Sequence, residues 1–196
     1  PIYLLTYVDD ILIITSRTVI IQSIKKELMS IFDARDLGEA TYFLGMDIIR
    51  DRPGRTIKLA QGRLTTDLLT KFDMLEAKSL NTPSNISIKL TKDGDPLDTK
   101  TCPYTTLVGS LMYLSICTRP DIAQAVGALT RYMAQPTVSH WTAAKTVLRY
   151  LVGTADFGIT FGSGQPGLDV YCDADYAGNI DTRRSTTAYA FILNGG

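Results

Sequence analysis

The first fifteen residues place the tightest limit on what this chain can fold into. Ile2 to Thr6 and Ile11 to Thr15 are rich in β-branched and other strand-forming side chains, and only Tyr7-Val8-Asp9-Asp10 separates them. Two short strands joined by a brief connection that contains Asp predict a β-hairpin. The chain therefore opens with a hairpin whose tip carries two adjacent carboxylates, Asp9 and Asp10.

The charge at this tip is uncompensated in the sequence, because the nearest cation along the chain is Arg17. Like charges about 4 Å apart repel by roughly 4 kcal/mol at an effective dielectric constant of 20. A divalent cation removes that repulsion, and Mg²⁺ prefers such hard oxygen ligands. Asp is also common in solvated turns. The residues alone therefore leave two interpretations open for Asp9 and Asp10, a metal site and an ordinary turn.

A second pair of carboxylates, Asp173 and Asp175, ends a predicted strand in the C-terminal part of the chain. The chain turns after these residues and enters another predicted strand at Thr186. No Lys or Arg is adjacent to either Asp, so the pattern permits a metal site. A solvated strand end is the alternative interpretation.

Hydrophobic patterning predicts helices and strands over most of the remaining chain. The predicted helices are Thr18 to Phe32, residues 64–72, a helix from Pro120 to a stop at Pro136, and a helix from an N-cap at Ser139 to Gly153. The predicted strands are Tyr42 to Ile49, Thr56 to Ala60, Phe157 to Phe161, Leu168 to Asp173 and Thr186 to Leu193. Asp51 to Gly54 predicts a hairpin turn, and residues 79–103 predict a linker or an ordered loop.

Composition excludes several classes of protein. With 45% hydrophobic and 20% charged residues, the 196-residue chain can bury a core and is not disordered throughout. No apolar run approaches the roughly 18 residues that cross a bilayer. Lys and Arg number 20, as do Asp and Glu, so net charge gives no indication of nucleic-acid binding. A single His disfavours Ser-His-Asp chemistry.

Cysteine spacing and the chain ends carry two further expectations. Cys102, Cys117 and Cys172 contain no CxxC pair, which disfavours a zinc site and a disulfide framework and favours incidental thiols in a reducing, intracellular compartment. The chain begins at Pro1 directly before an apolar run and ends directly after a predicted strand. Because exposed strand edges are normally covered, we expect a section of a longer polypeptide.

Several segments together resemble a known family. Tyr7-Val8-Asp9-Asp10 followed by Ile-Leu-Ile-Ile resembles the YVDD motif in the palm of reverse transcriptases. Further segments resemble the polymerase of copia-type LTR retrotransposons: Asp36 to Ala40, Tyr42 to Asp47, Tyr104 to Leu114, Thr118 to Ala123, His140-Trp141, Ala143 to Lys145 and Leu148 to Leu151. These segments match in order over nearly the whole chain.

The resemblance implies an α+β fold. Its parts would be the C-terminal part of a right-hand polymerase palm, thumb and connection segments, and the first strands of an RNase H-like fold. Residues 1–60 would end the palm and include the YVDD hairpin and a primer-grip-like hairpin. Residues 61–155 would form the thumb or connection helices and loop, and residues 156–196 would start a truncated RNase H-like domain.

The resemblance also assigns roles at the polymerase site. Asp9 and Asp10 would be the second and third members of the catalytic, metal-binding triad, with Asp9 the more direct ligand and the first member upstream of Pro1. Tyr7 and Val8 would lie near the primer end and the template. Phe43-Leu44-Gly45 is similar to the element that grips the primer 3′ end, with plain hairpin packing as the alternative.

In the RNase H-like part, the resemblance makes Asp173 the first of four catalytic, metal-binding carboxylates. Asp175 is a weaker candidate for the same site. The other three carboxylates of that site would lie beyond Gly196.

The implied function is RNA-directed DNA synthesis with hydrolysis of the RNA strand by an appended RNase H. The implied cofactor is Mg²⁺ or Mn²⁺, with two ions assisting nucleotidyl transfer. The implied partners are an RNA template, a DNA primer, dNTPs, an RNA–DNA hybrid and the rest of the Pol polyprotein, with no membrane. By family, the location would be a cytoplasmic particle or the nucleus. The isolated chain is expected to be incomplete and inactive.

Two alternatives remain open at this stage. One is a decayed or repurposed remnant that acts at most as a nucleic-acid-binding or interaction module. The other is a retained RNase H beside a dead polymerase.

A few other residues have mainly structural interpretations. We expect His140 and Trp141 to serve packing or helix capping, and Arg119-Pro120-Asp121 to start a helix with a local salt bridge. The basic pairs Lys25-Lys26 and Arg183-Arg184 fit either a solvated surface or phosphate contacts.

Overall fold

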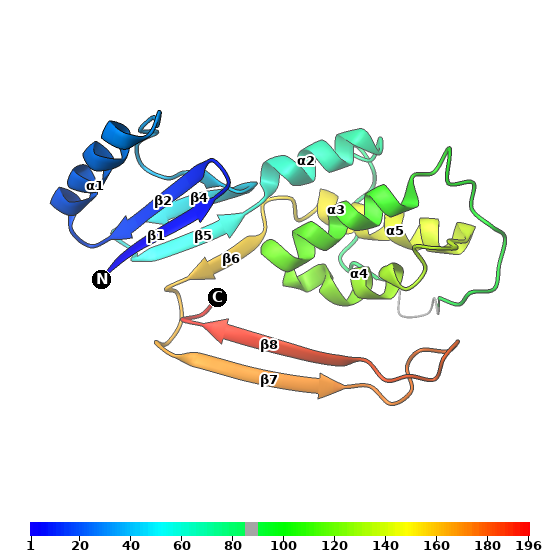
Figure 1. Cartoon of the computed structure of the whole chain (residues 1–196). Coiled ribbons are helices and arrows are strands. Elements are labelled where there is room, and N and C mark those ends of the chain that lie inside the picture. The colour runs from blue at the N-terminus through cyan, green and yellow to red at the C-terminus, as the bar shows by residue number, and fades with distance from the viewer. Residues whose placement is uncertain (85–89) are drawn as a thin grey trace. The chain divides into compact units, whose positions relative to one another are not determined.

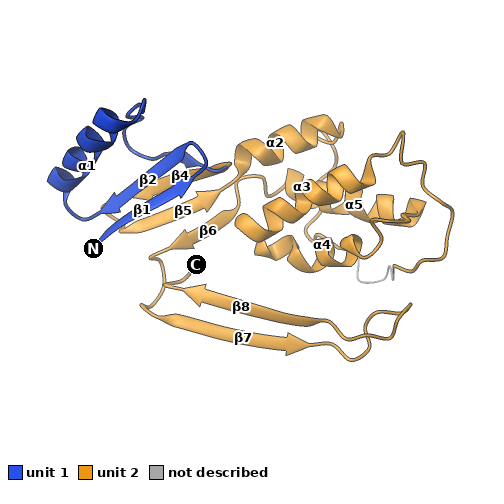
Figure 2. Cartoon of the chain, viewed as in Figure 1, with its two compact units in different colours: residues 1–44 blue, residues 45–196 orange. Residues whose placement is uncertain are grey.

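The computed structural model describes residues 1–84 and 90–196 and contains helices together with antiparallel strands in several sheets (Figure 1). This confirms the mixed α and β composition, whereas the assignment to palm, thumb and RNase H-like parts stays a prediction. The chain divides into two compact units, residues 1–44 and 45–196 (Figure 2). The predicted functional boundaries after residues 60 and 155 stay predictions.

The first unit is a hairpin followed by a helix. β1 (Ile2–Tyr7) pairs antiparallel with β2 (Asp10–Thr15) along its whole length, and α1 (Thr18–Ile31) follows. The predicted hairpin and helix are therefore confirmed. The connection between the strands is shorter than predicted, because only Val8 and Asp9 lie outside them.

Side chains of the first unit are largely exposed. α1 has no buried residue, and the strands expose large apolar side chains such as Tyr3 and Leu4. An ion pair of 2.6 Å between Lys25 Nζ and Asp36 Oδ1 ties α1 to the segment that follows it. This unit therefore contains well-formed secondary structure with little buried apolar surface.

The segment predicted as one strand from Tyr42 to Ile49 is interrupted. β3 (Tyr42–Phe43) ends before Leu44, and β4 (Met46–Asp51) begins after Gly45. Leu44 has a φ of 49° and Gly45 a φ of 76°, which is left-handed backbone that no strand accommodates. The prediction of a continuous strand is wrong at these two residues.

The sheet of the second unit joins segments far apart in sequence. β4 pairs antiparallel with β5 (Thr56–Ala60), and β5 pairs antiparallel with β6 (Gly158–Phe161). The predicted turn between β4 and β5 is confirmed. Gly158 allows the approach of β6, because a Cβ there would collide with the carbonyl oxygen of Leu59.

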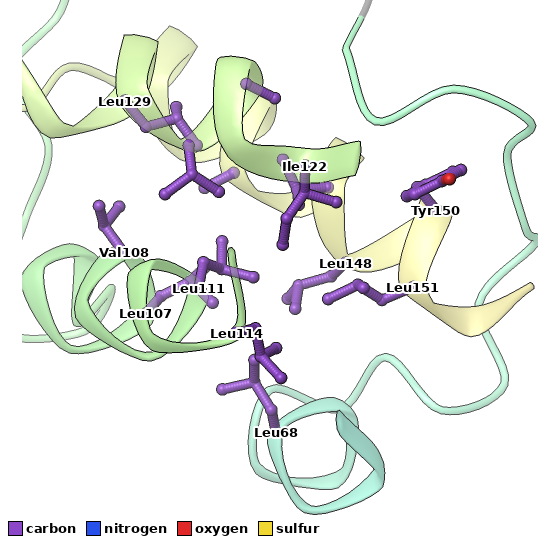
Figure 3. Packing of buried hydrophobic residues seen from close by; sticks show 14 of the residues in the cluster. Leu68, Leu107, Val108, Leu111, Leu114, Ile122, Leu129, Leu148, Tyr150 and Leu151 are labelled. Carbon is purple, nitrogen blue, oxygen red and sulfur yellow. The ribbon is translucent and has the colours of Figure 1, made fainter. Parts of the chain in front are cut away.

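The helices of the second unit hold the buried core (Figure 3). They are α2 (Gly62–Lys71), α3 (Tyr104–Cys117), the 3₁₀ turn η1 (Pro120–Ile122), α4 (Ala123–Thr130) and α5 (Val138–Val152). Leu111 on α3 and Leu148 on α5 have no exposed surface. Burial of apolar surface against neighbouring helices therefore organises this part of the chain.

Two of these helices correct the sequence-based expectations. The helix from Pro120 begins as predicted, but it is split into η1 and α4 and ends at Thr130, before the predicted stop. α5 has its N-cap at Thr137, two residues before Ser139. α3 is absent from the predicted helices altogether.

The segment between α2 and α3 is a loop, as predicted, and residues 85–89 lie outside the described residues. Backbone hydrogen bonds hold it to the helices: Leu80 N–H donates to the Arg149 carbonyl (3.1 Å), and Leu97 N–H donates to the Pro136 carbonyl (3.0 Å). A single β-bridge joins Pro96 to Thr137. The described part is therefore an ordered loop.

The C-terminal strands form a separate sheet of two. β7 (Leu168–Ala174) pairs antiparallel with β8 (Thr187–Leu193) along its whole length. Every residue of both strands is exposed. The strands confirm the predicted positions to within one residue at each end.

Candidate functional site

The hairpin tip of the first unit presents the two carboxylates that the sequence singles out. Asp9 is the second residue of the two-residue turn, and Asp10 opens β2 opposite Tyr7. Val8, the first residue of the turn, has a φ of 51°, a conformation that costs a β-branched residue strain. A positive φ at this position is typical of turns that match the twist of a hairpin.

Nothing in the described part of the chain neutralises these carboxylates. Asp9 and Asp10 are exposed, and neither forms an ion pair or a hydrogen bond with a described side chain. Two neighbouring carboxylates with free oxygens fit a hard divalent cation. Among residues 1–84 and 90–196, however, no three His, Cys, Asp or Glu side chains gather as a metal site.

The residues predicted near primer and template are exposed at the hairpin tip and partly buried at Phe43-Leu44-Gly45. Tyr7 is 58% exposed and Val8 is 88% exposed. Phe43 is partly buried, and Leu44 and Gly45 form the left-handed break described above. A Cβ on Gly45 would lie 3.2 Å from the Tyr113 hydroxyl oxygen, so the backbone passes close to α3 there.

The two carboxylates of the C-terminal part, Asp173 and Asp175, lie in different environments. Asp173 lies opposite Ala188 in the β7–β8 ladder, and among the described residues its Oδ1 accepts a hydrogen bond only from the neighbouring Ala174 N–H (2.8 Å). Asp175 Oδ1 accepts hydrogen bonds from the N–H groups of Thr186 (2.9 Å) and Gly178 (3.1 Å).

These bonds lower the pKa of Asp175, the Thr186 N–H most strongly and the Gly178 N–H next. Asp175 therefore organises the turn after β7, while the Asp173 carboxylate stays open to solvent.

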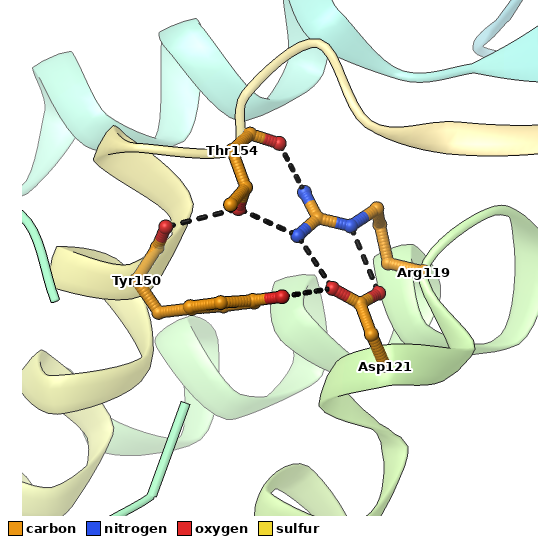
Figure 4. A network of polar contacts seen from close by, with 4 residues as sticks. All are labelled: Arg119, Asp121, Tyr150 and Thr154. Atoms are coloured by element: carbon orange, nitrogen blue, oxygen red, sulfur yellow. Dashed lines mark hydrogen bonds and ion pairs between the residues drawn. The ribbon is translucent and has the colours of Figure 1, made fainter. Parts of the chain in front are cut away.

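A buried cation lies within the second unit, at the residues predicted to start a helix with a local salt bridge (Figure 4). The Arg119 side chain donates to both carboxylate oxygens of Asp121 (3.0 and 2.8 Å) and to the carbonyl (2.8 Å) and hydroxyl (2.7 Å) oxygens of Thr154. Arg119 is 1% exposed and lies 5.6 Å from the ring centroids of Tyr150 and Phe157. The salt bridge is confirmed, and the rest of the network has no local sequence signal.

Asp121 is held ionised by this network. Burial by itself would raise the pKa of the carboxyl, but hydrogen bonds from Arg119 and from the Tyr150 hydroxyl (2.8 Å) outweigh it and lower the pKa. Arg119 joins the start of η1 to the end of α5, so its role in the structure is to hold these elements together.

His140 caps α5, which confirms the structural role expected for it. The Thr137 N–H donates to Nδ1 of His140 (2.9 Å), and the Thr137 side chain closes a capping box with the same turn. Trp141 packs against Phe72 with ring centroids 6.0 Å apart. Cys102 and Cys117 are partly buried, Cys172 is exposed, and all three are free thiols.

None of the helices in the described part of the chain has the length and apolar character needed to cross a membrane.

Comparison with known proteins places these features in a family. The family model "Reverse transcriptase (RNA-dependent DNA polymerase)" matches residues 2–86. The retrovirus-related Pol polyprotein from transposon TNT 1-94 of Nicotiana tabacum is 43% identical over 201 residues, covering 100% of this chain and 15% of the relative. The Pol polyprotein from transposon RE2 of Arabidopsis thaliana is 44% identical over 194 residues, covering 98% of this chain and 13% of the relative.

A third relative is close to this chain in length. An uncharacterized mitochondrial protein of Arabidopsis thaliana is 36% identical over 196 residues, covering 97% of this chain and 78% of the relative. No solved structure matches the chain significantly.

The family model and the two Pol polyproteins define the class as the reverse transcriptases of transposons. The chain belongs to the reverse transcriptase family of retrovirus-related Pol polyproteins from copia-type transposons. It spans 15% and 13% of the length of the two polyproteins described above.

Proposed function

We propose that this chain is a section of an RNA-directed DNA polymerase in which Asp9 and Asp10 bind divalent metal. The proposed polyprotein copies transposon RNA into DNA, with an RNA template, a DNA primer and dNTPs as its substrates. The proposal rests on family membership and on one structural observation: two adjacent, exposed carboxylates at the tip of a hairpin, without partners in the part of the chain that the structure describes.

The two carboxylates suit Mg²⁺ or Mn²⁺ in the type and charge of their donors. Divalent metal at such a site activates an attacking hydroxyl and stabilises the leaving phosphate oxygen. Asp9 and Asp10 contribute by holding negative charge at a fixed point of the hairpin. Tyr7 and Val8 flank that point on exposed surface, where they can contact primer and template. Two carboxylates leave the ligand set incomplete, so other parts of the polyprotein supply the remaining ligands.

The remaining assignments are part of the same proposal. Residues 1–60 end a polymerase palm, the Phe43-Leu44-Gly45 break contacts the primer 3′ end, and residues 61–155 form thumb or connection elements. Residues 156–196 begin an RNase H-like domain that acts on an RNA–DNA hybrid. The open carboxylate of Asp173 supports its role as a metal ligand there, whereas the internal hydrogen bonds of Asp175 argue against such a role.

Titration of the 196-residue chain with Mn²⁺ tests metal binding without requiring activity. Paramagnetic broadening of NMR signals is expected first at Asp9 and Asp10, and the Asp9→Asn/Asp10→Asn double variant should abolish it. Asp33→Asn is the matched control, because Asp33 is another exposed acid of the first unit. Equal loss of broadening in the control, or no broadening at the tip, would contradict the proposal.

Primer extension on an RNA template tests the polymerase itself in the full Pol polyprotein. Asp10→Asn should lower the extension rate by about 100-fold or more, as loss of a charge-stabilising group at a reaction centre does. Asp33→Asn should leave the rate nearly unchanged.

A specific observation also favours the second candidate, a non-catalytic remnant. This chain covers 78% of the uncharacterized mitochondrial relative, so a protein of similar length occurs outside a full polyprotein. Such a remnant would act as a nucleic-acid-binding or interaction module. An intact polyprotein reading frame around this chain, active in primer extension, would rule the remnant out.

A further inference from the structure

The turn that connects β7 to β8 is fastened to the helical part of the second unit through one carboxylate. The Lys92 backbone N–H lies 3.2 Å from both Oδ1 and Oδ2 of Asp181. The Tyr132 hydroxyl oxygen lies 3.0 Å from Oδ2 of the same carboxylate. Both contacts join residues far apart in the sequence, so they fix the position of the turn.

Asp181 is presented by an ordered turn. The Arg183 N–H donates to the Asn179 carbonyl (2.7 Å), the Asn179 N–H donates to the Arg184 carbonyl (3.1 Å), and the Thr182 N–H donates to Asn179 Oδ1 (3.0 Å). These bonds surround Asp181 on both sides. Because these bonds already fix the backbone around Asp181, little further conformational entropy is lost when its carboxylate accepts hydrogen bonds from Lys92 and Tyr132.

The donor on the helical side is equally well placed. Tyr132 is 5% exposed, and its ring stacks on His140 at a centroid distance of 3.9 Å and an interplanar angle of 17°. Its hydroxyl also lies 2.9 Å from the Leu90 carbonyl oxygen. The single hydroxyl proton is therefore shared between two acceptors, and loss of Asp181 would leave it fully bonded to Leu90.

Apolar packing does little to hold this turn. A cavity of about 700 Å³ separates it from α4 and α5, with Ala128 and Val147 on the helical side and Tyr176 and Ile180 on the turn. The strands β7 and β8 are exposed throughout. At the opposite end of the hairpin, the N–H groups of Gly162 and Gly164 reach the Asn194 carbonyl. Among the described residues, hydrogen bonds therefore attach the hairpin at its two ends, and the strands between these ends are exposed.

We propose that Asp181 is a positioning residue, a latch that holds the far end of the β7–β8 hairpin on the helical part of the second unit. The latch consists of Asp181, the Lys92 N–H and the Tyr132 hydroxyl. Releasing it frees the turn while the core stays folded, because the Lys92–Asp181 bonds are exposed and the buried Tyr132 keeps its second acceptor, the Leu90 carbonyl. The inference does not depend on metal binding by Asp173, although the latch fixes where that carboxylate is presented.

Hydrogen exchange at the Lys92 amide tests the latch in the 196-residue chain, because that N–H donates directly to Asp181. Asp181→Ala should accelerate exchange at Lys92 by about three- to tenfold, as expected for loss of a partly solvated hydrogen bond to a charged acceptor. Asp181→Asn keeps one acceptor oxygen and should restore part of the protection. Asp169→Ala, which removes an exposed acid of β7, is the matched control and should leave Lys92 unchanged.

Two readouts separate a latch from general destabilisation. Exchange at buried amides of α3 should be unchanged in Asp181→Ala, whereas a loss of global stability would accelerate it. Trypsin cleavage after Arg183 and Arg184 should rise about three- to tenfold in the same variant, because cleavage follows the population of the released turn. Unchanged exchange at Lys92, or equal acceleration at Lys92 and in α3, would overturn the proposal.

Discussion

The helices of the second unit and the two terminal hairpins differ in how they are stabilised. Nearly every residue of the core cluster lies on α2 to α5, including Leu107, Leu114 and Leu151 with no exposed surface. β1, β2, β7 and β8 contain no buried residue. Both proposed catalytic sites, at Asp9-Asp10 and at Asp173, lie on these exposed hairpins.

The difference separates what folds the chain from what is proposed to do chemistry. Isolated two-stranded hairpins are marginally stable in water, whereas a helical cluster with fully buried side chains is stable through its own packing. The helices therefore provide the stable part, and the hairpins present carboxylates on surfaces open to other segments. Substitutions in each part of the chain test this difference.

The largest effect is expected in the helical core. Leu111→Ala should lower the free energy of unfolding by about 2–5 kcal/mol, because it leaves a cavity where the side chain has no exposed surface. Leu4→Ala on β1, where the side chain is 51% exposed, should cost less than about 1 kcal/mol. Urea denaturation followed by circular dichroism measures both. Similar costs at the two positions would contradict the comparison.

The next largest effect is expected at the buried cation. Asp121→Asn leaves the Arg119 guanidinium with its Thr154 partners but without a counter-charge, and should cost about 1–3 kcal/mol. The loss is at the low end for a buried pair because the Asp121 side chain is 33% exposed. Asp156→Asn, at an exposed acid two residues after Thr154, is the control in the same urea experiment. Equal midpoints for the two variants would show that the network is dispensable.

Local signals predicted much of this architecture. The β-branched and other strand-forming residues among the first fifteen predicted the hairpin correctly, and the stripe of Ile20, Ile24 and Leu28 predicted the helix α1 correctly. α3 was missed although Leu107, Leu111 and Leu114 have helical spacing, because its apolar residues spread around the helix and weaken the stripe. The break at Leu44 was missed because a non-glycine residue adopts left-handed backbone there.

Contacts over long sequence distances could not be predicted in the same way. The Arg119–Thr154 bonds and the Asp181–Tyr132 contact join residues 35 and 49 positions apart. Nothing in local composition identifies such partners. At Asp9, Asp10 and Asp173 the residues alone left a metal site open beside a solvated turn or strand end. Motif resemblance favoured the metal site, and these roles stay predictions.

A smaller, pH-dependent effect is expected at His140. Burial lowers the pKa of its imidazole, against a backbone group of Thr91 and the Asp181 carboxylate, which act to raise it. The unfolded chain, with a His pKa near about 6.5, then binds a proton that the folded chain does not. The contribution of His140 to the free energy of unfolding should therefore be constant above about pH 6.5. It should fall as the pH drops below about 6.5.

His140→Gln sharpens this prediction, because Gln at the same position can complete a capping box without titrating. Urea denaturation at about pH 7 and about pH 5 should show a smaller loss of stability in the variant than in the parent chain. Equal losses would assign the acid sensitivity to other groups.

The smallest effect is expected on the exposed C-terminal hairpin. Val170→Thr exchanges a methyl group for a hydroxyl on β7, where Val170 is 55% exposed and lies opposite Phe191. Both residues favour strands, so the free energy of unfolding should change by less than about 0.5 kcal/mol. The measurement is the urea midpoint at two protein concentrations that differ about tenfold. A loss above about 1 kcal/mol that grows with concentration would mean that a second copy covers this apolar face in solution, since only an associated state depends on concentration. The hairpin would then be a buried interface, and its contrast with the helical core would hold for the single chain alone.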